Sequence, residues 1–240
     1  MIKLFAGNDV MVKNPNCEQK QLAAIWKQVL VVVYVKLIFP ANFQTPWHQA
    51  IDRRSKEGRV MAKQAEIEKE LTKLPILEYV FFKPEEIVFS KEVRDLCQGN
   101  SCGMYNSTWA CPPAVGSVES CIEKCQVYDK AMLFTTATEV ANSFDMKGWL
   151  RARVEHEALT DQVADVFRRF DENALILSTE GCTVCKKCTY PDAPCRFPDR
   201  MYPATEGYGI MVMQMAPALN ISYNNGANTV TYFSMVLFNE

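Results

Sequence analysis

Histidine is scarce in this 240-residue chain, which contains only His48 and His156. Catalytic zinc sites commonly use histidines, and the metalloprotease pattern His-Glu-x2-His needs two of them one helical turn apart. That pattern is absent from the sequence, as are a glycine-rich phosphate loop and a serine nucleophile elbow. Zinc proteolysis, phosphoryl transfer and serine hydrolysis therefore have no support in the sequence.

Long hydrophobic runs and excess positive charge are also lacking. The run 29–39 is interrupted by Lys36 and is much shorter than the roughly 20 residues that a membrane span requires. Acidic Asp9 and Glu18 precede it, and the segment lacks the cleavage site of a signal peptide. The net charge of −2 and the pI near 5.8 disfavour binding to a phosphate backbone. We therefore expect a cytoplasmic protein with no membrane and no nucleic-acid partner.

Cysteine, in contrast, is abundant, with ten residues in the chain. Because no export signal is recognised, we expect reduced thiols that serve as metal ligands rather than disulfides. Four of the ten lie in one segment with the spacing Cys-x2-Cys-x2-Cys-x6-Cys: Cys182, Cys185, Cys188 and Cys195. This density indicates a metal-ligand loop.

The overlapping triple in this segment favours an iron–sulfur cluster over zinc. Bacterial ferredoxins use Cys-x2-Cys-x2-Cys with a more distant fourth cysteine, whereas zinc sites more often use two separate Cys-x2-Cys pairs or include histidines. Cys195 either completes the same cluster or binds a second one, and the spacing fits both. Lys186, Lys187 and Arg196 would offset the negative charge of a thiolate-bound cluster, although the two lysines suit a solvated surface equally well.

A second group of cysteines has the spacing Cys-x4-Cys-x8-Cys-Pro-Pro and consists of Cys97, Cys102 and Cys111. Turn-forming residues surround them, so we expect them on a loop. Tyr105 and Trp109 lie between them and would shield a cofactor from water, or simply pack in the core. The group is one ligand short of four, and Cys195 or a non-protein ligand would complete it. An open coordination position would suit a catalytic iron.

The remaining cysteines and His156 have simpler interpretations. Cys121 and Cys125 share one face of a predicted helix, where buried free thiols are expected. Their Cys-x3-Cys spacing also occurs in radical enzymes that use S-adenosylmethionine. Those enzymes need a third cysteine at the position of Tyr128, so the sequence does not support this class. His156 lies between two glutamates on a predicted long helix, where we expect a surface or rim residue rather than a catalytic base.

Periodicity predicts an α/β (α+β) fold, a single sandwich with a mixed sheet and two cysteine-rich loops. The predicted strands cover 76–82, 131–138, 174–177 and 228–238. The predicted helices cover 62–73, 84–96, 117–128, 146–170 and 205–215. Each cysteine loop begins where a predicted helix or strand ends.

Residues 1–60 differ in charge from the rest, with nine Lys/Arg against four Asp/Glu. We expect them to form an atypical N-terminal extension, with the metal-binding α/β domain at 61–240. Lys56, Glu57 and Gly58 can be encoded as a bacterial ribosome-binding sequence, which would make Met61 the translation start. An ordinary extension is the alternative.

Taken together, the motifs resemble a prokaryotic family described as predicted metal-binding proteins of unknown function. The resemblance covers 76–238 and includes Trp109-Ala110-Cys111-Pro112-Pro113, Pro194-Cys195-Arg196-x-Pro198 and Glu206-x2-Gly209-Ile210 together with the other cysteines of the two groups. It implies seven metal ligands, namely Cys97, Cys102, Cys111, Cys182, Cys185, Cys188 and Cys195. Cys17, Cys121 and Cys125 are left outside this pattern.

Three functions follow from these observations. The first is a small iron–sulfur protein with one or two 4Fe–4S clusters that passes single electrons to a partner enzyme, with Arg196, Tyr105 and Trp109 beside the cofactor. The second is a zinc-binding structural or interaction protein without redox activity. The third is an enzyme that works at an open iron, which would require a substrate pocket.

Overall fold

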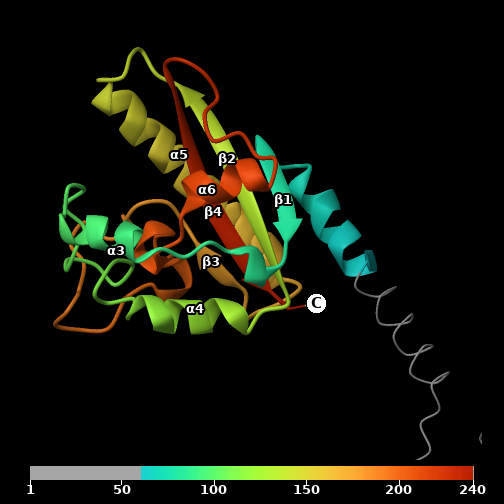
Figure 1. Ribbon diagram of the computed structural model, residues 1–240, viewed down its shortest axis with the longest axis horizontal. Helices are drawn as coiled ribbons and strands as arrows, with labels where there is room; N and C mark the ends of the chain where they lie inside the picture. Colours follow the sequence, from blue (N-terminus) through green and yellow to red (C-terminus); the bar gives the residue numbers. More distant parts are fainter. Residues whose placement is uncertain (1–60, 240) are drawn as a thin grey trace, which may run out of the picture. The chain divides into compact units, whose positions relative to one another are not determined.

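The computed structural model describes residues 61–239 and contains a four-stranded sheet (Figure 1). The strands are β1 (Glu78–Phe82), β2 (Lys130–Glu139), β3 (Leu175–Leu177) and β4 (Thr229–Phe238). They are ordered β1-β2-β4-β3. The expectations about the charged extension and the run 29–39 lie outside the described residues.

The α/β class is confirmed, but the expectation of a mixed sheet is wrong. All three pairings between the named strands are antiparallel. β2 and β3 run in the same direction, but the last strand, β4, is inserted between them. Its antiparallel ladder with β2 extends from Thr229 to Phe238, so among the four described strands no two neighbours are parallel. Sequence periodicity cannot reveal such an insertion.

Helices cover both faces of the sheet, because alternate side chains of each strand point to opposite faces. On one face, α5 (Met146–Arg168) and the helical residues 61–71 pack against Phe134 and Val236. On the other face, α4 (Val118–Gln126) and α6 (Val212–Ala218) pack against Leu133. Residues 61–239 therefore form a helix–sheet–helix sandwich.

Cys121 and Cys125 of α4 are fully buried in the second of these cores. Both are free thiols, as their shared helical face predicts.

The predictions of the four strands, of α4 and of α5 agree with the structure to within a few residues. Ser117 caps α4 by accepting a hydrogen bond from the Ser120 amide at 3.2 Å.

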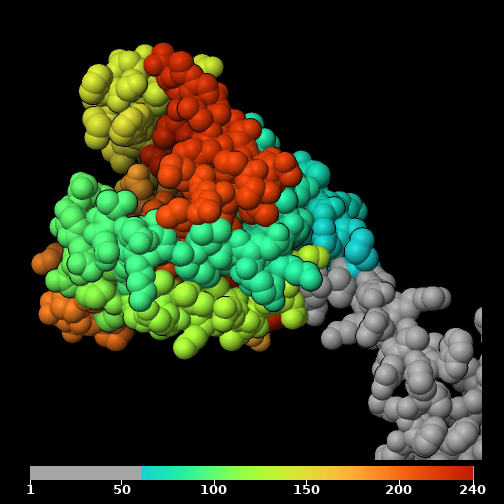
Figure 2. All heavy atoms as spheres, viewed as in Figure 1, coloured from blue at the N-terminus to red at the C-terminus, as the bar shows by residue number. Residues whose placement is uncertain are grey.

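The helix predicted over 84–96 is wrong as a single element. A short 3-10 turn, η1 (Pro84–Glu86), is followed by extended chain and then by α3 (Lys91–Gln98). Phe89 forms a β-bridge with Ile210, and the Met211 amide donates to the Val88 carbonyl at 2.8 Å. Figure 2 shows these two regions of the chain packed side by side. Tertiary pairing therefore overrides the local helical pattern.

The helix predicted over 205–215 is also divided. It consists of the 3-10 turn η3 (Glu206–Tyr208) and α6, separated at Gly209, which has a φ of 76°. A side chain at Gly209 would meet the Ser90 carbonyl oxygen at 3.0 Å. Glycine is required here by both the left-handed backbone and the close approach.

Within residues 61–239, no helix is long and apolar enough to cross a membrane.

Candidate metal centre

The four clustered cysteines lie on an irregular segment between β3 and η3. Backbone hydrogen bonds close its base: Ser178 donates to Pro203 and Thr205 donates to Ser178, each at 2.9 Å. The Ala204 amide donates to the Ala110 carbonyl at 3.1 Å. The base of this segment therefore lies directly beside the first cysteine group, although some seventy residues or more separate them in sequence.

Cys182, Cys185, Cys188 and Cys195 line one small cavity. Its volume is about 20 Å³, which is close to the space that one water molecule occupies by this measure. All four are free thiols and are only partly exposed. The structure therefore brings Cys195 to the same place as the overlapping triple.

The donor set of this cavity fits a thiolate-bound metal. Four cysteines line it, together with residues that include no carboxylate and no imidazole, and such a set suits an iron–sulfur cluster or a zinc site with four thiolate ligands. As the side chains stand, however, no group of three or more His, Cys, Asp or Glu residues in the described part of the chain is arranged to hold a metal ion. Binding would require the thiols to turn towards one another.

Trp109 joins the first cysteine group to this cavity. Its side chain lines the cavity, and its Nε1 donates a hydrogen bond to the Ala193 carbonyl at 3.2 Å. The indole also packs against the Tyr190 ring in a T-shaped arrangement, with ring centroids 4.9 Å apart. Tyr105 does not line the cavity. Of the two aromatic residues predicted beside a cofactor, the structure brings only Trp109 to the four thiols.

Arg196 also lines the cavity and donates a hydrogen bond to the Lys187 carbonyl. This contact ties the end of the segment back to the residues between Cys185 and Cys188. The Thr189 hydroxyl donates to the Pro194 carbonyl at 2.8 Å and makes a second internal tie. The sequence suggests a charge role for Arg196, and the structure adds a role in shaping the loop.

The first cysteine group is only partly on a loop, because Cys97 lies within α3. Burial raises the pKa of the Cys97 thiol, and the Glu206 carboxylate raises it further. Burial also raises the pKa of Cys111, to about 11, with smaller contributions from Cys102 and Cys97. These mutual effects indicate that the three thiols and Glu206 lie in one region, although their side chains as they stand are not arranged to hold a metal ion.

Gly181 is one of the points where the two cysteine segments touch. A Cβ atom there would lie 2.7 Å from Met104 Cγ and 3.1 Å from Cys111 Sγ. Such distances are too short for an ordinary carbon contact. A residue without a side chain is therefore needed immediately before Cys182.

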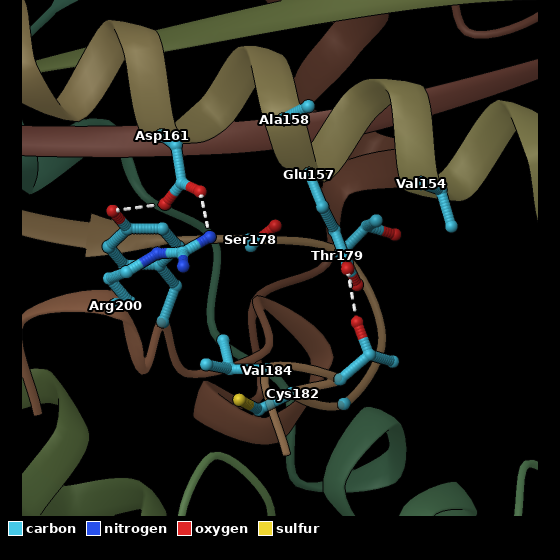
Figure 3. Close-up of a pocket in the computed structure, with 12 residues that line it drawn as sticks. Val154, Glu157, Ala158, Asp161, Ser178, Thr179, Cys182, Val184 and Arg200 are labelled. Atoms are coloured by element: carbon cyan, nitrogen blue, oxygen red, sulfur yellow. Dashed lines mark hydrogen bonds and ion pairs between the residues drawn. The ribbon is translucent and has the colours of Figure 1, made fainter. Parts of the chain in front are cut away.

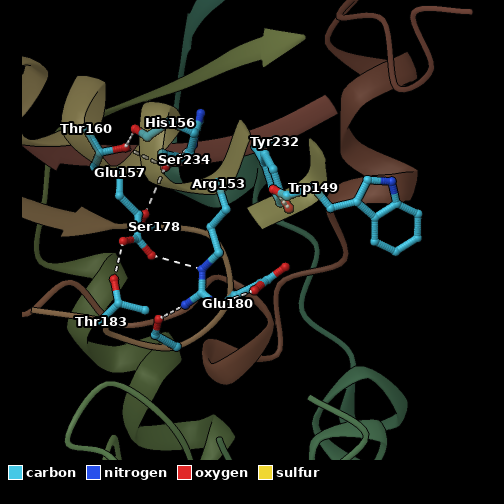
Figure 4. Close-up of polar contacts among 11 residues, drawn as sticks. Trp149, Arg153, His156, Glu157, Thr160, Ser178, Glu180, Thr183, Tyr232 and Ser234 are labelled. Carbon is cyan, nitrogen blue, oxygen red and sulfur yellow. Dashed lines mark hydrogen bonds and ion pairs between the residues drawn. The ribbon is translucent and has the colours of Figure 1, made fainter. Parts of the chain in front are cut away.

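Two arginines that sequence reasoning missed anchor the cysteine segments. Arg153 of α5 is buried, pairs with Glu157 at 3.1 Å and Glu180 at 2.7 Å, and donates to the Gly181 carbonyl (Figure 4). Arg94 of α3 donates to the Gly207 and Gly116 carbonyls. The signal in the sequence was weak, since only the i,i+4 spacing of Arg153 and Glu157 suggested a pair.

The expectation that His156 lies on the surface is wrong. Its ring is fully buried, and its Nδ1 lies 2.8 Å from Thr136 Oγ1. Its Nε2 lies 2.8 Å from Ser234 Oγ (Figure 4). Burial lowers the pKa of His156 to about 4. The spacing of Ala152, His156, Leu159 and Val163 could have revealed this, because it follows one helical face that is otherwise apolar.

These features define an α/β protein with two cysteine groups that meet beside the end of β3. A model of the predicted metal-binding protein family DUF2284 matches residues 80–238, and the chain belongs to this family. The match includes all seven cysteines of the two groups but specifies neither the metal nor an activity. No curated protein and no solved structure matches the chain.

Proposed function

We propose that this protein is an iron–sulfur electron carrier whose 4Fe–4S cluster is held by Cys182, Cys185, Cys188 and Cys195. The observation that carries the proposal is that these four thiols line one cavity. When bound, such a cluster supplies single-electron chemistry. The protein's own contribution is to provide four ligands, to cover part of the site with Trp109 and to place the Arg196 guanidinium beside it.

The surroundings of the cavity support transfer to another protein. Lys186, Lys187 and the segment 191–194 are exposed around it. Electron exchange needs a centre close to a surface that a partner can approach, and this loop provides one. We propose a protein redox partner in a reducing, cytoplasmic compartment, because the nine described cysteines are all free thiols.

A zinc-binding structural protein is the second candidate. The small size of the cavity, about 20 Å³, favours it, because a single ion needs less rearrangement of the thiols than a cluster does. The Cys-x2-Cys-x2-Cys spacing favours iron–sulfur. The two candidates differ in colour, metal content and redox behaviour.

Metal analysis of the anaerobically purified protein tests the proposal. We expect iron and acid-labile sulfide, with a brown absorbance at about 400 nm that dithionite bleaches. A colourless protein with stoichiometric zinc would contradict the electron-carrier function and establish the second candidate. Cys121→Ala is a suitable control, because Cys121 is buried in the hydrophobic core and does not line the four-cysteine cavity.

The number of clusters is a separate question, because Cys97, Cys102 and Cys111 form a second group. We propose that this group holds its own iron site, since Cys195 lines the cavity of the other group and, after burial, the charges of Cys102, Cys97 and Glu206 add to the raised pKa of Cys111. Cys185→Ser should then remove about half of the iron, in line with two equivalent clusters. Loss of all iron from a folded protein would show that the two groups share one site.

A further inference from the structure

Charged side chains beside the four-cysteine cavity already have hydrogen-bond partners. A pocket of about 310 Å³ adjoins the cavity, and two carboxylates of α5 line it (Figure 3). Glu157 accepts a hydrogen bond from the Thr183 hydroxyl. Asp161 accepts one from the Tyr202 hydroxyl at 2.8 Å and one from the Arg200 guanidinium at 2.7 Å. These carboxylates therefore need no ligand to complete their hydrogen bonds.

Three buried hydroxyl groups in the described part of the chain, in contrast, have no hydrogen-bond partner: those of Thr108, Thr135 and Thr205. Burial of a hydroxyl without a partner is unfavourable. Thr135 lies within β2, in register with Phe233 of β4, and Thr205 immediately precedes η3. Thr108 differs from both, because it shares a tight turn with Cys111, a proposed metal ligand.

Backbone hydrogen bonds hold this turn in place. The Cys111 amide donates to the Thr108 carbonyl at 3.4 Å, and the Asn106 amide donates to the Pro112 carbonyl at 2.8 Å. The first and last residues of such a four-residue turn lie within about 7 Å of one another. Thr108 and Cys111 are also both buried. The hydroxyl and the thiol are therefore enclosed in the same small region.

The Thr108 hydroxyl already acts on the Cys111 thiol. Burial raises the pKa of Cys111 to about 11, and the Thr108 hydroxyl opposes this increase. A hydroxyl has this effect because it stabilises the thiolate form of a nearby cysteine. As the side chains stand, however, the hydrogen bond is not complete, and the thiols must turn before they can hold a metal ion. The missing hydrogen bond and the required movement concern the same sulfur atom.

We propose that Thr108 is a positioning residue of the first cysteine group, and that its hydroxyl donates a hydrogen bond to the Cys111 thiolate when the metal is bound. A metal binds the thiolate, and a charged acceptor forms a stronger hydrogen bond than a neutral one. The buried hydroxyl would then gain the partner that it lacks in the metal-free arrangement. Iron and zinc both bind thiolates, so the hydrogen bond does not depend on which metal is present.

The consequence for reduction potential rests on the proposed function, because only a redox centre has such a potential. Hydrogen bonds to sulfur are among the factors that set the potential of an iron–sulfur cluster. The reduced cluster carries one more negative charge, so a donor stabilises it more than the oxidised cluster. Each tenfold loss of this preference lowers the potential by about 59 mV.

A redox titration of the full-length, anaerobically purified protein tests the proposal, with electron paramagnetic resonance as the readout. Thr108→Val keeps the shape of the side chain and removes no hydrogen bond that this hydroxyl makes within the described residues. We expect a midpoint potential that is more negative than that of the wild type. Thr108→Ser retains the hydroxyl and should stay close to the wild type. An unchanged potential in Thr108→Val would overturn the proposal.

Loss of iron from Thr108→Val, with iron retained in Thr108→Ser, would also support the role of the hydroxyl. Thr135→Val is the matched control. It removes another buried hydroxyl without a partner, by the same substitution, from a strand that carries no cysteine. Its potential and iron content should equal those of the wild type. Equal effects of the two valine substitutions would show a general consequence of altered packing and contradict the role of Thr108.

Chelator competition separates this proposal from the electron-carrier function. A purified protein that contains zinc would contradict that function, and the hydrogen bond is then measured through zinc affinity. Thr108→Val should bind zinc about tenfold more weakly than the wild type, and Thr135→Val should bind it equally well. Equal zinc affinities in the wild type and Thr108→Val would overturn the assignment of Thr108.

Discussion

At the scale of single residues, the thiols combine partial burial with raised pKa values. Burial raises the pKa of Cys97, of Cys111 and of Cys182 above the ordinary value of 9.0. These thiols are therefore protonated at neutral pH when no metal is bound. Metals bind the thiolate form, so binding must release protons.

Zinc affinity should therefore increase with pH. Each thiol that loses its proton on binding contributes about a tenfold increase per pH unit below its pKa. We expect competition with a chromophoric chelator to show affinity that rises steeply between about pH 6 and pH 8. Affinity that does not change over this range would show that the ligands are already thiolates in the metal-free protein.

His156 gives a second prediction at the residue scale. Its pKa is about 4 in the folded protein, whereas its ordinary value is 6.5. The unfolded chain binds a proton on His156 more readily than the folded protein does. The contribution of neutral, buried His156 to the stability of the fold is therefore complete above pH 6.5 and is lost as the pH falls towards about 4. Between these values the free energy of unfolding should decrease by up to about 1.4 kcal/mol per pH unit.

Urea unfolding of wild-type protein and His156→Gln at several pH values checks this prediction. Gln can retain hydrogen bonds to Thr136 and Ser234 but cannot take up the proton. The variant should therefore lose less stability on acidification than the wild type. Equal losses would show that His156 does not control the acid sensitivity.

At the scale of elements, close contacts and buried arginines hold the cysteine segments together. Gly181→Ala should force Met104 and Cys111 away from the segment that carries Cys182, because the added Cβ would be 2.7 Å from Met104 Cγ. We expect a loss of about 1–3 kcal/mol in the free energy of unfolding and a lower metal content.

Gly207→Ala is the matched control for this variant. A Cβ at Gly207 would meet its nearest atom, Pro112 Cδ, at an ordinary 3.4 Å. Denaturant unfolding and iron per chain should therefore stay close to wild type. If the two variants behave alike, the contact between the cysteine segments at Gly181 is not important.

Arg153→Met tests the anchor between α5 and the cysteine segment. It would leave Glu157 and Glu180 without their buried partner, and it would remove the donor to Gly181. We expect a loss of about 3 kcal/mol of stability, measured by urea unfolding, together with reduced iron binding. Arg151→Met is the control, because Arg151 is 61% exposed in its ion pair with Glu155; it should cost under about 1 kcal/mol. A similar loss in both variants would contradict the anchoring role.

The strands and the long helix α5 could be predicted because their apolar patterns agree with their final environment. The segment 84–96 could not, since the bridge between Phe89 and Ile210 joins residues over a hundred positions apart. Local sequence also contains no sign that Ala204 contacts Ala110. For the site, spacing placed Cys182, Cys185 and Cys188 on one loop but left open whether Cys195 belongs with them, and the structure lines one cavity with all four. The positions of Arg153, Gly181 and the neighbouring pocket depend on tertiary packing.

At the scale of the whole molecule, both cysteine groups lie within residues 80–238, the part of the chain that matches the family. One group begins in α3, and the other follows β3. The two meet at Gly181 and at the Ala110–Ala204 hydrogen bond. A metal centre held by the four clustered cysteines would then adjoin a second pocket, because Cys182 and Val184 line both the cavity and that pocket.

The most direct test of the iron–sulfur claim is electron paramagnetic resonance of anaerobically purified protein after dithionite reduction. Cys188→Ser and Cys121→Ala are compared with the wild type. The account predicts a signal from a reduced 4Fe–4S cluster in the wild type, with the signal from the Cys182–Cys195 loop lost in Cys188→Ser and retained in Cys121→Ala. A wild-type protein that contains zinc and gives no such signal would contradict it.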